Sequence, residues 1–220
     1  MLYMAAKVSY MMAILTRFNN IANQYYYLIT VFYSEMRLTM LLDTPICDFG
    51  WQAPDFNLKN ANGDVFSMSE NLGEKGLLIM FICNHCPYVK AIATRLAEDT
   101  EQLMAEGINI LAVMSNDYQH VEADSPQNML RFAEQYGFKF PYLVDEDQQV
   151  GKQYGAVCTP DFFGFNHLGE LQYRGRLDDA RLHNDPNREP ELLNAMQLIA
   201  AIGKGPKQQT ASMGCSIKWR

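Results

Sequence analysis

The chain has 220 residues, of which 48% are hydrophobic and 20% are charged. This length and composition fit one globular domain with a real core, and they exclude bulk disorder and a need for disulfide staples. The 18 basic and 25 acidic side chains give a formal charge of −7, which argues against non-specific nucleic-acid binding because such binding requires a basic face. The five cysteines are few and odd in number. They disfavour a secreted disulfide scaffold and leave room for reactive thiols.

The first 35 residues differ from the rest of the chain. They contain Lys7 and Arg17 but no acidic residue before Glu35, and their apolar runs are each about half of the roughly 20 residues that a membrane span needs. Three interpretations stay open: an organelle presequence, a real accessory element, or a natural start at Met36, which we favour. We assign residues 1–42 to an N-terminal extension, predict no membrane span and expect a cytoplasmic protein.

Regular structure is expected from about Gln52 onwards. In chain order, the hydrophobic pattern first predicts a strand over 53–58, a turn at 62–64, a return strand at 65–66 and a buried strand over 76–82. A helix over 87–106, a second buried strand over 108–114 and a helix from Ser125 to Gly137 follow. The last predicted elements are a strand over 142–144, a helix over 148–154, a hairpin of 161–165 and 171–173, and a helix over 189–202. This order predicts an α/β domain over 43–205 with a mixed sheet between helices, followed by a tail over 206–220.

The chemistry is concentrated at residues 83–87, Cys-Asn-His-Cys-Pro, where the first buried strand meets the first long helix. A cysteine at a helix start meets free backbone N–H groups and the positive end of the helix dipole, and both stabilise the thiolate. Pro87 suits the first helical position, and His85, when protonated, would lower the pKa of Cys86 further. The pair Cys83 and Cys86 therefore predicts a nucleophilic thiol rather than two inert buried cysteines.

A second motif, Cys-Thr-Pro at residues 158–160, precedes the strand of the hairpin. Together the two motifs resemble the thioredoxin superfamily, in which a loop with a cis proline faces the redox cysteine. Ala53–Phe56, Asn84–Val89 and Ser212–Trp219 are similar to bacterial members of the AhpC/TSA type, which includes peroxiredoxin-like and TlpA-like proteins, over roughly residues 45–205. The resemblance implies a thioredoxin-like fold with helices on both faces of the sheet.

The resemblance also implies a thiol–disulfide oxidoreductase with an antioxidant role. Cys86 would attack a disulfide, Cys83 or Cys158 would resolve the mixed species, and an external dithiol would recycle the enzyme without a cofactor. Pro160 would shape the substrate groove and leave the backbone of Thr159 free to pair with an extended substrate. The expected substrate-binding residues are Thr159, Pro160, His85 and Tyr88.

Peroxide reduction is the alternative within the same chemistry. The peroxiredoxin string Pro-x-x-x-Thr-x-x-Cys places Ile79 and Cys83 where that family has Pro and Thr. Its arginine position falls on Gln172, with Arg174 and Arg176 close by. Without these donors the O–O bond is not polarised in the usual way, so disulfide exchange ranks above peroxide reduction.

A metal-binding, non-catalytic protein is the alternative of another class. Four residues would then converge as ligands for zinc, copper(I) or an iron–sulfur cluster: Cys83, His85, Cys86 and Cys158. We expect no metal, because this spacing is tight. Cys47 is expected to be incidental, and Cys215, in the polar tail, is either a mobile resolving thiol or unpaired.

Overall fold

Residues 41–220 are the part of the chain that the computed structural model describes, and the interpretations of residues 1–40 lie outside it. The elements are, in chain order, β1 Leu41–Asp43, β2 Asn57–Asn60, β3 Val65–Ser67, α2 Met68–Asn71, β4 Leu77–Phe81, α3 Pro87–Ala105, β5 Asn109–Met114, the 3₁₀ helix η1 Glu122–Asp124, α4 Pro126–Tyr136, β6 Tyr142–Val144, α5 Gln149–Gln153, β7 Cys158–Thr159, β8 Asp161–Phe165, β9 Leu171–Tyr173, α6 Glu191–Ile202 and β10 Met213–Ser216. No described helix has the length and apolar character required to cross a membrane.

The central sheet has seven strands in the order β3-β2-β6-β5-β4-β8-β9. The three middle strands β6, β5 and β4 are parallel, and the strands outside them are antiparallel to their neighbours. A second sheet of three short strands has the order β1-β10-β7. The predicted mixed sheet is confirmed.

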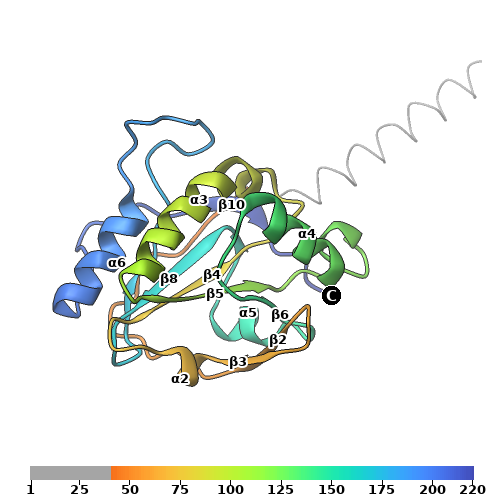
Figure 1. Cartoon of the computed structure of the whole chain (residues 1–220), viewed down its shortest axis with the longest axis horizontal. Coiled ribbons are helices and arrows are strands. Elements are labelled where there is room, and N and C mark those ends of the chain that lie inside the picture. Colours follow the sequence, from red (N-terminus) through yellow and green to blue (C-terminus); the bar gives the residue numbers. More distant parts are fainter. Residues whose placement is uncertain (1–40) are drawn as a thin grey trace, which may run out of the picture. The chain divides into compact units, whose positions relative to one another are not determined.

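Strand β4 is buried on both faces, as its continuous apolar run predicts. Because successive side chains point to opposite faces, Leu78 and Met80 join the core under α3, α4 and α6, whereas Leu77, Ile79 and Phe81 join the core on the α5 side. Figure 1 shows these three helices on one side of the sheet and α5 on the other. Helices therefore flank both faces of the sheet.

The long helices begin and end close to the predicted residues. Pro87 opens α3 with Cys86 as its N-cap residue, and Ser125 occupies the same position before α4. Helix α4 ends at Gly137, whose φ of 73° is left-handed and suits glycine. These boundaries follow from local sequence signals, which explains why they are readable from the chain.

The strand predicted over 53–58 begins only at Asn57. Before it, the Asp55 carboxylate accepts hydrogen bonds from its neighbour Phe56 N at 2.9 Å and from Ser69 N at 3.0 Å. Such side-chain to backbone bonds compete with strand pairing. The short elements β1, α2, η1, β7 and β10 have no counterpart in the sequence prediction, because segments this short carry little periodicity.

The last residues do not behave as the expected tail. Met213–Ser216 form β10, which pairs antiparallel with β1 on one side and with β7 on the other. Backbone bonds continue the contact beyond the strand, from Ile217 N to Val157 O at 3.1 Å and from Asp117 N to Lys218 O at 2.8 Å. The C-terminal residues are thus built into the domain, and β1 starts inside the range assigned to the extension.

Candidate active site

Cys86 lies at the end of the loop that joins β4 to α3. It is the N-cap residue of α3, with φ −64° and ψ 121°, and its side chain does not cap the helix. The sulfur is therefore free for other contacts, and the thiol donates to the backbone O of Thr159 at 3.1 Å. Cys86 is fully buried, so this site is closed to solvent.

Cys83 lies three positions before Cys86, in the loop that follows β4, and it also contacts Thr159. Its sulfur is 3.1 Å from the hydroxyl oxygen of Thr159, and the residue is 1% exposed. Thr159 thus contacts Cys86 through its carbonyl group and Cys83 through its hydroxyl group. The two cysteines of the C-x-x-C motif are brought together around it.

The peptide bond between Thr159 and Pro160 is cis, as the resemblance predicts. The Cys158 thiol, also predicted at the site, is buried and donates to Pro160 O at 3.8 Å. Among the hydrogen bonds of residues 41–220, none joins Cys158 to Cys86.

Cys215, which the sequence placed in a polar tail as either a mobile resolving thiol or unpaired, lies at the site in a fixed strand. It lies opposite Thr159 in the pairing of β10 with β7, and it is 3% exposed. Gly214 makes this approach possible, because a Cβ there would lie 2.0 Å from Thr159 O. The expectation that the Thr159 backbone is free to pair with a substrate is wrong, since β10 already pairs with it. The signal in the sequence that could have placed Cys215 at the site is the string Ser212–Trp219, which contains it and is part of the family resemblance.

The pKa values of the buried thiols are shifted in opposite directions. Hydrogen bonds from the side chains of Cys215 and then Cys83, together with the backbone N–H of Val89, hold the pKa of Cys86 well below its ordinary value despite burial. Burial raises the pKa of Cys83, and hydrogen bonding to Cys86 raises that of Cys215. On ionisation Cys86 loses its bond to Thr159 O but accepts from donors of three residues, Cys215, Cys83 and Val89. The thiolate is therefore stabilised mainly by two thiols. The imidazole of His85 is not among the groups that lower the pKa of Cys86 most.

His85 is oriented by a buried carboxylate. Its ring Nδ1 is 2.6 Å from Asp124 Oδ2, in η1, and its backbone N–H donates to Asp124 Oδ1 at 3.1 Å. Asp124 also accepts from Asn84 N at 2.8 Å and from Asn116 Nδ2 at 2.7 Å. These four bonds fix the loop between β4 and α3, and with it the position of Cys86.

A possible metal site among the described residues comprises Cys83, His85 and Asp124, whose ligand atoms lie within 4.8 Å of one another. This set shares only two residues with the metal alternative drawn from the sequence, because Cys86 and Cys158 do not belong to it. The four hydrogen bonds on Asp124 already satisfy its carboxylate. An ion would have to replace them, so the geometry favours thiol chemistry.

The residues near the peroxiredoxin arginine position have other partners. Arg174 is buried against Asp161 at 2.9 Å, donates to Gly155 O and lies over the ring of Phe163 at 4.4 Å. Arg176 forms an ion pair with Glu191, in α6, at 2.5 Å. Neither has a hydrogen bond to Cys86 in the described part of the chain, so neither of these two arginines is aimed at the thiol.

A cavity of about 390 Å³ adjoins the site beside Pro160. It lies between α3, β10 and the loop after β9, and its walls mix apolar and polar side chains, among them Tyr88, Ile92, Phe162, Leu177, Arg181 and Met213. Two of the expected substrate-binding residues, Pro160 and Tyr88, therefore face open space.

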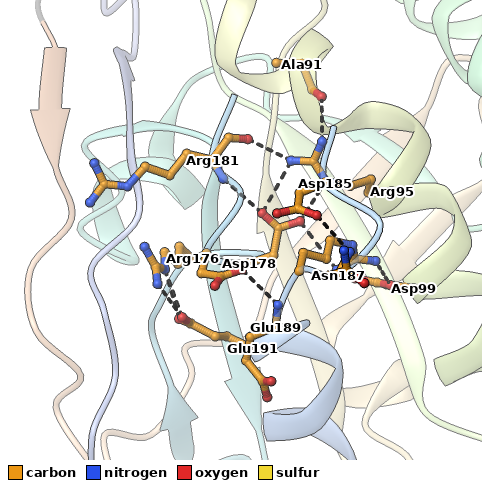
Figure 2. Close-up of polar contacts among 12 residues, drawn as sticks. Ala91, Arg95, Asp99, Arg176, Asp178, Arg181, Asp185, Asn187, Glu189 and Glu191 are labelled. Carbon is orange, nitrogen blue, oxygen red and sulfur yellow. Dashed lines mark hydrogen bonds and ion pairs between the residues drawn. The ribbon is translucent and has the colours of Figure 1, made fainter. Parts of the chain in front are cut away.

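A buried ion pair shapes one wall of this cavity. Arg95 Nε contacts Asp178 Oδ2 at 2.7 Å, and both side chains are almost fully buried. Arg95 also donates to Arg181 O at 2.7 Å, while Asp178 accepts from Arg181 N at 3.2 Å. These bonds hold Arg181 at a φ of 54°, which non-glycine residues rarely adopt. Figure 2 shows its guanidinium group pointing away from this cluster.

The sequence and the fold of the chain are similar to those of known proteins. The model of the AhpC/TSA family matches residues 49–174. Among solved structures, a conserved protein from Geobacillus kaustophilus is 39% identical, with a TM-score of 0.77 over 82% of this chain and 97% of that one. The thioredoxin domain of a thiol-disulfide oxidoreductase from Bacteroides vulgatus is 15% identical, with a TM-score of 0.54 over 69% of this chain and 97% of that one. The expected thioredoxin fold is confirmed.

Two curated relatives carry different activities in their names. Peroxiredoxin Bcp from Escherichia coli is 26% identical over 117 residues, which cover 53% of this chain and 70% of that protein. Thiol-disulfide oxidoreductase ResA from Bacillus subtilis is 26% identical over 140 residues, which cover 63% and 74%. The chain is thus similar to both branches considered from the sequence.

We expect Arg174→Met to lower the free energy of unfolding by about 3–5 kcal/mol at neutral pH, because it leaves a buried carboxylate unpaired. Burial already raises the pKa of Asp161 to about 6 although Arg174 opposes it, and loss of the guanidinium group raises this pKa further. A carboxyl group with a raised folded-state pKa binds protons more readily when folded, so the deficit shrinks as pH falls.

Urea unfolding at about pH 8 and about pH 5 measures this deficit on both sides of the Asp161 titration. Lys139→Met, at an exposed position, is the control for loss of a positive charge. A deficit that is equal at the two pH values would contradict the assignment.

We also expect the wild type to hold one thiolate at about pH 6, where an ordinary cysteine is almost fully protonated. Thiolate ultraviolet absorbance during a pH titration measures it. The signal should disappear in Cys86→Ser and persist in Cys158→Ser, because burial raises the pKa of Cys158. A wild type whose first thiolate forms only above about pH 8 would be incompatible with the site described.

Proposed function

The chain belongs to the AhpC/TSA family, and from this premise we propose that it is a thiol–disulfide oxidoreductase whose nucleophile is Cys86. The observation that carries the proposal is the placement of Cys86 at the start of α3, where Thr159 contacts both Cys86 and Cys83 and pairs with Cys215. In these surroundings the pKa of Cys86 is held well below its ordinary value by the neighbouring thiols. Its relatives are named as thiol-disulfide oxidoreductases and peroxiredoxins, and both activities depend on a thiolate.

The first step is attack of the Cys86 thiolate on one sulfur of a substrate disulfide. A new bond forms between Cys86 and that sulfur, the substrate S–S bond breaks, and the leaving thiolate takes a proton. A second thiol then loses its proton and attacks Cys86, which forms an internal disulfide and releases the other half of the substrate as a thiol. Of the two resolving partners predicted from the sequence, Cys83 is the one that hydrogen bonds to Cys86.

The resolving step becomes easier once Cys86 has reacted. The hydrogen bond with Cys86 is one cause of the raised pKa of Cys83, second to burial. In the mixed disulfide Cys86 carries no charge, so this cause disappears and Cys83 ionises more readily. An external dithiol then reduces the internal disulfide and completes the cycle.

We propose that the remainder of the substrate sits in the cavity beside Pro160, because the Thr159 backbone is already paired with β10. Tyr88 and Pro160 line this cavity next to the helix that carries Cys86. A cytoplasmic location is consistent with the proposal, since all five cysteines are free thiols and such thiols persist in reducing compartments.

We expect Cys86→Ser to reduce disulfide turnover by at least about a hundredfold, because the nucleophile is lost. Protein-disulfide and peroxide turnover should be measured side by side with the same dithiol reductant. Cys47→Ser is the matched control, since burial raises the pKa of that thiol to about 11.

A Cys86→Ser variant that keeps full activity in both assays would rule out the mechanism. Faster turnover of peroxide than of disulfides in the wild type would assign the chain to the alternative, a peroxiredoxin-type peroxide reductase. Stoichiometric metal with no free thiols, in protein purified without chelator, would instead support the metal-binding alternative.

We expect Ala211→Trp to raise KM by about tenfold with little change in kcat, because it fills the cavity and removes about 1.4 kcal/mol of binding that does not change during the reaction. Ala211 lines the cavity. Ala201→Trp, at an exposed position of α6, is the control. A Trp variant with wild-type KM and an unchanged melting temperature would show that the substrate does not use the cavity.

A further inference from the structure

The C-terminal strand occupies the position that an extended partner of β7 would take. A free strand edge next to a reactive cysteine invites pairing by an added strand, which is a common mode of peptide recognition. Here β10 fills that edge, with Cys215 opposite Thr159 and Ser216 opposite Cys158. The chain therefore holds its own strand where a substrate strand would lie.

Cys215 is brought toward Cys86 by this register. Thr159 is the common neighbour: its carbonyl oxygen accepts from the Cys86 thiol at 3.1 Å, and its backbone pairs with Cys215. Strand β10 also packs against α3, the helix that starts at Cys86, and Figure 1 shows the two elements side by side. Through Thr159, Cys86 is thus brought near both a thiol of its own loop, Cys83, and a thiol of the C-terminal strand, Cys215.

The position of Cys215 is fixed from both directions along the chain. Before it, Ser212 Oγ donates to Pro160 O at 2.8 Å, and Thr44 N donates to Ser212 O at 2.8 Å. After it, Ile217 N donates to Val157 O at 3.1 Å. Cys215 is therefore not a mobile tail thiol, and it stays near Cys86 while the chain is folded.

The closure of the site makes this proximity relevant to catalysis. Cys83, Cys86 and Cys215 are all at most 3% exposed, and none of them lines the adjoining cavity. Ser212 and Met213, directly before Cys215, do line it. A substrate in the cavity therefore contacts β10 directly before Cys215, next to the helix that starts at Cys86.

We propose that Cys215 is a second resolving thiol, which attacks Cys86 in the mixed disulfide and fastens β10 to α3 through a Cys86–Cys215 disulfide. In this step the Cys215 thiol loses its proton, a bond forms between the sulfurs of Cys215 and Cys86, and the bond from Cys86 to the substrate sulfur breaks. The departing substrate thiolate takes the proton, so atoms and electrons balance. This inference rests on the proposed function of Cys86.

The test is oxidation of the reduced protein by one equivalent of a small-molecule disulfide, followed by acid quenching and non-reducing peptide mapping. The variants are wild type, Cys83→Ser, and the double variant Cys83→Ser with Cys215→Ser, with Cys47→Ser as control. We expect Cys83→Ser to form a Cys86–Cys215 disulfide and to release both halves of the oxidant. The double variant should stop at the mixed disulfide on Cys86.

A Cys83→Ser protein that accumulates the mixed disulfide on Cys86 while Cys215 stays a free thiol would overturn this inference alone. A Cys86 that takes up no oxidant in any variant would overturn the proposed function as well, so the two failures are distinguishable.

A second variant covers the case in which loss of Cys215 impairs folding. Gly214→Ala in the Cys83→Ser background keeps the thiol but pushes a Cβ against Thr159 O. We expect it to slow the formation of the Cys86–Cys215 disulfide while the first step on Cys86 proceeds. Ser216→Ala, in the same strand and with no such clash, is the control. Equal rates in the two variants would contradict a role for the β10 register.

Discussion

The antiparallel pairing of β10 with β7 is the constraint on which the rest of the site depends. It places Cys215 opposite Thr159, whose carbonyl and hydroxyl groups contact Cys86 and Cys83. Gly214 permits the close approach because no Cβ is present to meet the Thr159 carbonyl. As a result three sulfurs share a volume that solvent does not reach, and their hydrogen bonds must be made to one another, to the backbone and to the Thr159 hydroxyl group.

This arrangement explains how a buried thiol becomes acidic. Burial alone disfavours a thiolate, and it raises the pKa of Cys83 and Cys158 in this structure. Cys86 departs from this rule because donors converge on it from Cys215, Cys83 and the first turn of α3. The same hydrogen bonds set the order of the reaction steps. The thiols of Cys83 and Cys215 stay protonated while Cys86 is a thiolate, and they ionise more readily after Cys86 has reacted.

The features that the sequence predicts are those that local signals specify. The junction of a buried strand with a helix that starts at Pro87 is readable from an apolar run, a proline and helical spacing, and the cis peptide bond before Pro160 followed from the resemblance. The position of Cys215 depends on a strand of four residues that pairs with a strand of two, far too short for periodicity. The contact of His85 with Asp124 likewise crosses from one loop to another, so spacing along the chain could not reveal it.

The partners of the arginines bear on which electrophile the site suits. A peroxide requires donors that polarise its O–O bond, but Arg174 is engaged by Asp161 and Arg176 by Glu191. A disulfide does not require such donors, since a thiolate attacks its sulfur directly and the leaving thiolate needs only a proton. The thiols that surround Cys86 can supply that proton, so no arginine is needed for this step. The same thiols that stabilise the attacking thiolate therefore also serve its leaving group, which is the physical reason to place disulfides before peroxides as substrates.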